Sequence, residues 1–150
     1  MPLRSPHKVK QQRRVLLLAL YILKRRGHDR PSKKQVLNFI SWNRLMHVPA
    51  DDSDLRSTGD EIWENDLAFR RADLKDDGLL DKPDWNVWHL TKRGEENVQA
   101  WAHRIKELHD KDPNFADNYK FDPTDELSFE FYITPKAFEF AMKIVTGTLQ

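Results

Sequence analysis

The chain has 150 residues, 39% hydrophobic and 33% charged, which is enough for one hydrophobic core of ordinary size. It contains no cysteine, which excludes a disulfide framework and cysteine-ligated zinc and fits a reducing cytoplasm. The longest apolar run, residues 15–23, is too short to span a bilayer, and the basic residues 24–26 follow it where a signal peptide needs small ones. We therefore expect a cytoplasmic protein that does not contact membranes.

Charge is distributed unevenly along the chain. Residues 1–34 contain eleven Lys and Arg against a single acid, Asp29, which is a net charge of +10. The other 116 residues contain 14 basic and 23 acidic residues, a net −9. This asymmetry is typical of a basic segment that binds a polyanion while an acidic body faces away. The alternative is a basic segment that is only solvated.

Two helices are expected in this basic part. Residues 1–10 contain two prolines and no apolar period, which predicts a flexible basic arm. A first helix over 11–26 should end at Gly27, and Ser32 with Gln35 forms a capping box that begins a second helix over 33–42. The loop over 43–56 is long for a helix-turn-helix and indicates an insertion. The residues of the second helix expected to face inward are Val36, Leu37, Phe39 and Ile40.

A third helix is expected over residues 60–77, with a capping box made by Thr58 and Glu61. Helical periodicity puts Trp63, Leu67 and Leu74 in one inward sector. Ile62 and Phe69 fall in a second sector, which we expect the C-terminal extension or a partner subunit to cover. The side chains expected to face outward are Glu61, Glu64, Asn65, Ala68 and Arg71.

A two-stranded hairpin should follow this helix. Gly78 stops the helix, a strand begins at Leu79, residues 83–86 form a turn, and a second strand over 87–90 returns to Thr91. Thr91 opens a fourth helix that continues over 95–110 with one apolar side. This order predicts an α+β fold, mainly α, with a winged helix-turn-helix over residues 11–110.

Residues 111–150 are expected to form a C-terminal extension of one strand and one helix. Residues 113–124 read as a linker, residues 127–133 as a strand, and Thr134 with Pro135 as the start of a helix over 135–146. This helix has two adjacent apolar stripes, and we expect one to remain exposed as the interface of a homodimer. The alternative is that both stripes are buried within one chain. The expected dimer stripe is Phe138, Ala141 and Val145; the other is Ala137, Phe140 and Ile144.

A spaced set of residues between positions 63 and 94 resembles a known family. The set is Trp63-Glu64-Asn65, Leu67, Phe69, Arg71, Leu74, Gly78-Leu79-Leu80, Trp88, Leu90-Thr91 and Gly94. It resembles the N-terminal winged-helix domain of Mrr-type restriction endonucleases, which precedes a nuclease domain and recognises DNA, often modified DNA. The resemblance covers about a fifth of the chain, extends more weakly back to Arg13, and implies DNA recognition without the nuclease domain.

Catalytic patterns are not found. His103 and His109 are six residues apart and fall on opposite sides of a helix, so they do not form a zinc pair. Asp73-Leu74-Lys75 has the spacing of a nuclease motif, but it lies within a helical pattern in which Leu74 is core. We expect no enzymatic activity, no metal and no cofactor.

The expected function is double-stranded DNA binding, as a transcriptional regulator or as the reader module of a restriction system. The alternatives are a winged helix that binds a partner protein through its acidic surface (Asp60, Glu61, Glu64 and Asp66), and a DNA-recognition subunit of a multi-chain restriction or defence enzyme. Ala68 is small enough to touch a base methyl group. The residues expected to contact DNA are Lys8, Lys10, Arg13, Arg14, Lys33, Lys34, Ser57, Thr58, Glu64, Asn65, Ala68, Arg71, Lys82, Trp85, Asn86 and Lys92.

Overall fold

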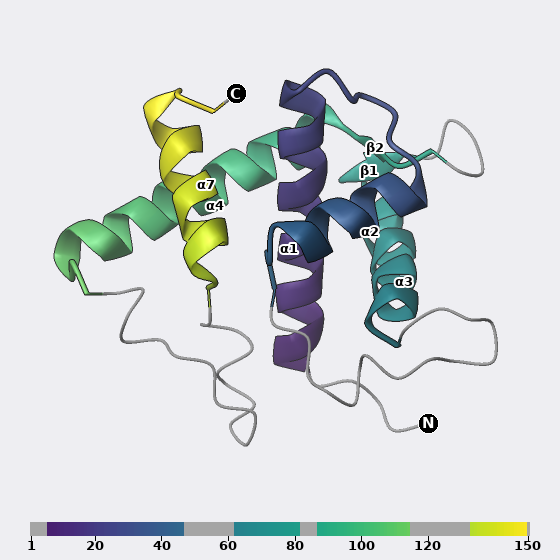
Figure 1. The fold of residues 1–150 in the computed structure, drawn as a ribbon, viewed down its shortest axis with the longest axis horizontal. Coiled ribbons are helices and arrows are strands. Elements are labelled where there is room, and N and C mark those ends of the chain that lie inside the picture. The colour runs from purple at the N-terminus through teal and green to yellow at the C-terminus, as the bar shows by residue number, and fades with distance from the viewer. Residues whose placement is uncertain (1–5, 47–61, 82–86, 115–132, 150) are drawn as a thin grey trace.

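The computed structural model describes residues 6–46, 62–81, 87–114 and 133–149, and these form a mainly helical fold with one small sheet (Figure 1). The described part contains five helices and two antiparallel strands, which confirms the expected α+β, mainly α class. None of the described helices combines the length and the apolar character needed to cross a membrane. The elements are α1 (Pro6–Arg25), α2 (Lys33–Trp42), α3 (Ile62–Asp76), β1 (Leu80–Asp81), β2 (His89–Leu90), α4 (Lys92–Lys111) and α7 (Pro135–Thr146).

Helix α1 is the centre of the molecule. Every residue from Val15 to Leu23 is buried, because α2, α3, α4 and β2 all pack against this helix. In Figure 1, α1 stands in the middle, with α3 on one side and α4 passing behind it toward α7. The uninterrupted apolar run is therefore a helix covered on all sides.

Both ends of α1 and the start of α2 can be compared with the sequence. The helix begins at Pro6 rather than at residue 11, so the described part of the expected flexible arm is helical. It ends as expected before Gly27, whose φ of 91° is in the left-handed region. The Ser32–Gln35 capping box and the four buried side chains of α2 are confirmed.

Helix α3 buries the expected sector and exposes the second one. Trp63, Leu67 and Leu74 are in the core. The expectation that the C-terminal extension covers Ile62 and Phe69 was wrong for Phe69, which is 58% exposed, because α7 packs against α4 instead; cover by a partner subunit stays a prediction. The expected cap residues Thr58 and Glu61 lie outside the described residues.

The hairpin and the start of α4 form a tightly joined unit. Leu80 pairs with Leu90 and Asp81 with His89 in antiparallel register. The Thr91 hydroxyl donates to the carbonyl oxygens of Gly78 (2.8 Å) and Leu79 (3.0 Å) and accepts from the backbone N–H of Gly94. One side chain thus caps α4 and fixes the end of α3 to it. The expected turn at residues 83–86 lies outside the described residues.

Helix α7 has the bounds expected from Thr134 and Pro135, and Gly147 ends it with a φ of 72°. The expected exposed stripe was wrong: Ala141 is fully buried, and Phe138 and Val145 are partly buried against the core. The reason is that α7 has neighbours on two sides. Phe138 contacts the ring of His109 on α4 (5.1 Å between centroids), and Phe140 contacts Phe39 on α2 (6.2 Å). Of the expected strand over 127–133, only Ile133 is described, and it is not in a strand.

Candidate nucleic-acid interface

A cluster of basic residues spans the end of α1, the turn after it and the start of α2; we call residues 24–34 the α1–α2 connection. Residues 24–34 contain six Lys and Arg and one acid, Asp29. Arg25, Arg30 and Lys34 are exposed. Because like charges are held close together along a short segment, this connection is a positive surface suited to an anionic partner.

The basic connection is bonded to the hairpin. The backbone N–H of Trp88, the residue before β2, donates to the carbonyl oxygen of Pro31 (3.0 Å). Lys24 Nζ lies 3.5 Å from the carbonyl oxygen of Leu90 and 3.5 Å from a carboxylate oxygen of Glu95. The connection, the hairpin and the C-terminal end of α3 consequently lie together at one end of the molecule (Figure 1).

His89 provides a further link between these parts. Its Nδ1 lies 3.0 Å from Asp81 on β1, and its Nε2 lies 3.5 Å from Asp29 in the basic connection. The imidazole therefore bridges two carboxylates from two segments. Asp29 is also 3.7 Å from Lys24, so the one acid of the connection is already engaged with two side chains.

Arg71 does not point outward, and the expectation that it does was wrong. Its Nη2 donates to the carbonyl oxygen of Val87 (2.7 Å), and its guanidinium lies 5.0 Å from the centre of the buried Trp88 ring. Desolvation by burial lowers the pKa of Arg71 from its ordinary value. The side chain positions the hairpin against α3.

The exposed face of α3 differs from the expected one. Glu64, Asn65 and Ala68 are only partly exposed. The face is more apolar and less acidic than the sequence indicated. Its most exposed members are Phe69, Ala72, Lys75 and Asp76.

The cations at the N-terminal half of α1 are mostly engaged within the fold. Lys8 is 7% exposed, Arg13 forms an ion pair with Asp77, and the Arg14 guanidinium lies 5.9 Å from the centre of the Trp101 ring. Lys10 is exposed. The expectation of an outward-facing contact was wrong for Lys8, because a central helix has neighbours on most of its sides.

The remaining expected contacts fall into two groups. Lys34 and Lys92 are exposed at the first turns of α2 and α4, and Lys33 is partly exposed beside Lys34. The others lie outside the described residues: Ser57, Thr58, Lys82, Trp85 and Asn86.

The sequence Asp73-Leu74-Lys75, which has the spacing of a nuclease motif, lies within α3. Asp73 pairs with Arg70 (2.9 Å) and Leu74 is fully buried, which confirms that Asp73-Leu74-Lys75 is part of a structural helix. Within the described ranges, no three His, Asp or Glu side chains gather at a possible metal site.

Comparisons of the chain with protein-family models, with curated proteins and with solved structures found no match.

Proposed function

We propose that this protein binds double-stranded DNA as a winged helix-turn-helix. In this arrangement α3 would lie in the major groove, the hairpin would be the wing, and the α1–α2 connection would contact phosphates. The protein would then be a non-enzymatic regulator or the recognition module of a restriction system, as the resemblance to the Mrr-type domain implies.

The observation that carries this proposal is the hydrogen bond from Trp88 to Pro31. In winged helices the chain between the first two helices runs beside the returning strand of the wing, and here the bond joins those two segments. It also brings the exposed cations Arg30 and Lys34 to the same end of the molecule as the hairpin. Positive charge beside a wing is what phosphate contacts require.

A salt titration of duplex binding tests the proposal. If about five cations neutralise phosphates, log Kd should change with log salt with a slope of about 4 to 5 in magnitude. A slope near zero for the folded, full-length protein would overturn DNA binding.

Protein binding is the second candidate function, and Phe69 favours it. This ring is 58% exposed between Ala68 and Ala72 on the face of α3 that the first proposal places in the groove. Exposed aromatic residues are enriched at protein interfaces. If the wild type binds duplexes, a folded Phe69→Ser variant tests this candidate. A variant that keeps full duplex affinity would show that this face does not contact DNA, and it would support protein binding there.

We also propose that the protein forms a homodimer, because a two-fold assembly would suit DNA with two half-sites about one helical turn apart. Because the stripe Phe138, Ala141 and Val145 packs within one chain, such an interface would use another surface.

A further inference from the structure

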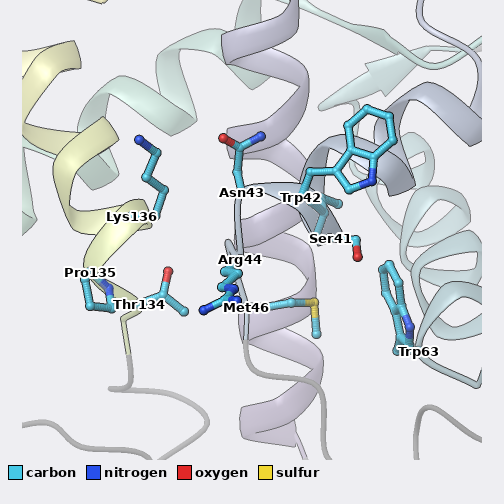
Figure 2. A pocket seen from close by; sticks show the side chains of 10 residues that line it. Ser41, Trp42, Asn43, Arg44, Met46, Trp63, Thr134, Pro135 and Lys136 are labelled. Atoms are coloured by element: carbon cyan, nitrogen blue, oxygen red, sulfur yellow. The ribbon is translucent and has the colours of Figure 1, made fainter.

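A second surface feature lies away from the hairpin, where α2 ends and α7 begins. A groove of about 790 Å³ opens between the end of α2, the residues that follow it, Trp63 at the start of α3, and residues 134–136 (Figure 2). Its volume is within the range of roughly 300–1,000 Å³ that small-molecule sites occupy. We call this feature the α2–α7 groove.

Two tryptophans line the α2–α7 groove in different ways. Trp63 is 4% exposed and belongs to the core, whereas Trp42, the last residue of α2, is 78% exposed. In Figure 2 the Trp42 ring stands at the upper edge of the groove and Trp63 lies below it. Tryptophan is highly buried on average, so a ring this exposed beside a groove offers a flat apolar surface for stacking.

The described lining of the groove has a positive charge. The described residues that line it include two cations, Arg44 and Lys136, and no carboxylate. Lys136 lies 3.4 Å from Glu139, but Glu139 also pairs with Lys143 at 3.2 Å, so one carboxylate serves two ammonium groups. The groove therefore favours an anionic ligand.

Arg44 is held at the groove by an unusual backbone conformation. Its φ of 50° is in the left-handed region, where the residue after a helix is usually Gly or Asn. The turn is fixed by bonds from Arg44 N to Ser41 O (3.2 Å) and from Leu45 N to Ile40 O (3.1 Å). Figure 2 shows the Arg44 side chain at the centre of the groove, between Thr134 and Met46.

We propose that the α2–α7 groove binds a single nucleotide unit, with the base stacked on Trp42 and the phosphate held by Arg44 and Lys136. An aromatic platform combined with cations is how proteins bind unpaired nucleotides with little dependence on sequence. The unit can come from a free mononucleotide or from a single strand of nucleic acid. This site does not depend on duplex binding by the α3 surface.

Binding measurements on the full chain test this proposal with two probes. A short fluorescently labelled oligodeoxyadenylate is titrated by anisotropy, and dAMP is titrated by calorimetry. Trp42→Ala removes the stacking surface and should weaken binding by about tenfold or more, whereas Trp42→Phe should retain most of the affinity. Arg44→Gly suits the left-handed turn and removes one cation, so it should weaken binding and reduce the salt slope by about 0.7 on a single strand.

Arg104→Gln provides the control, because it removes an exposed cation of α4, which belongs to neither the groove nor the proposed duplex-binding surface. Its affinity for both probes should equal that of the wild type. Tight binding of dAMP would identify a mononucleotide site, and binding of the oligonucleotide alone would identify a single-strand site. The proposal is overturned if neither probe binds at about millimolar concentration, or if Trp42→Ala and Arg44→Gly bind like the wild type. If both probes bind the groove as expected but the protein does not bind duplex DNA, the result counts against duplex binding by the α3 surface and not against the groove.

Discussion

Gly94 shows how closely two parts of the backbone approach at the base of the hairpin. A Cβ atom at this position would lie 2.3 Å from the carbonyl oxygen of Leu79 and 2.6 Å from a methyl carbon of Leu90. The first neighbour is backbone, which cannot rotate away. The spacing Leu90-Thr91-x-x-Gly94 therefore has a physical cause, since Thr91 caps the helix and Gly94 allows the contact.

We predict that Gly94→Ala destabilises the fold. Relieving the overlap requires a shift of α4 away from Leu79, and such overpacking costs about 1–3 kcal/mol of unfolding free energy. Urea denaturation measures the change. Glu96→Ala, an exposed substitution on the same helix, should change stability by less than about 0.5 kcal/mol. Equal stability of the wild type and Gly94→Ala would refute the close approach.

Arg71 gives a second prediction at the scale of one residue. Arg71→Met removes the bond to Val87 and the contact with Trp88, which should cost about 1–2 kcal/mol of unfolding free energy. Because Arg71 positions the hairpin, affinity should fall for all duplexes alike. Urea denaturation and selection from random duplexes measure the two effects, with the exposed Arg104→Met as the control. A changed sequence preference at unchanged stability would make Arg71 a base reader instead.

Among the elements, α7 is the one whose packing departs most from the expected role. Its contacts with α4 and α2 make it part of the core, since Phe140 and Ala141 are almost fully buried. A helix that is apolar over a wide arc must be covered, and here the same chain supplies the cover.

Phe138→Asp should therefore destabilise the monomer rather than separate two subunits. A carboxylate beside His109 and the core loses apolar burial and needs solvation, which should lower the unfolding free energy by more than about 1 kcal/mol. Thermal unfolding and light scattering on the same samples decide the matter. A variant that keeps its melting temperature but halves its mass would place a dimer interface at Phe138 after all.

Local signals in the sequence predicted the elements well. Three helix starts are specified by signals that span no more than four residues: Ser32 with Gln35, Thr91, and Thr134 with Pro135. Helices α2, α4 and α7 therefore begin where the sequence indicated. The neighbours of an element were harder to predict. Periodicity showed that Phe69 lies outside the core sector of α3, but it could not show that α7 packs elsewhere.

The candidate site was predictable only in part for the same reason. The density of cations between residues 24 and 34 was visible in the sequence, whereas the bond from Trp88 to Pro31 joins segments more than fifty residues apart. Arg71 was expected to face outward because a helical wheel cannot show the carbonyl oxygen that it binds. The exposure of Trp42 had a usable signal, since this residue falls outside the buried sector of α2.

At the scale of the whole molecule, the charge asymmetry becomes a localised feature. The +10 of residues 1–34 is divided between α1, where Lys8, Arg13 and Arg14 contact other parts of the fold, and the α1–α2 connection, where Arg25, Arg30 and Lys34 are exposed. The connection is thus the part of the basic segment best placed to meet an external polyanion. DNA binding by this end of the molecule is the central claim.

The salt dependence of duplex binding by a connection variant tests that claim most directly. Replacing Arg30 and Lys34 together by Gln should weaken binding and reduce the log–log salt slope by about 2, because each phosphate contact contributes about 0.9. Arg104 and Lys111, exposed on α4, provide a control pair of equal charge whose replacement by Gln should leave the slope within about 0.5 of the wild type. Equal slopes for the two pairs would contradict DNA binding through the α1–α2 connection.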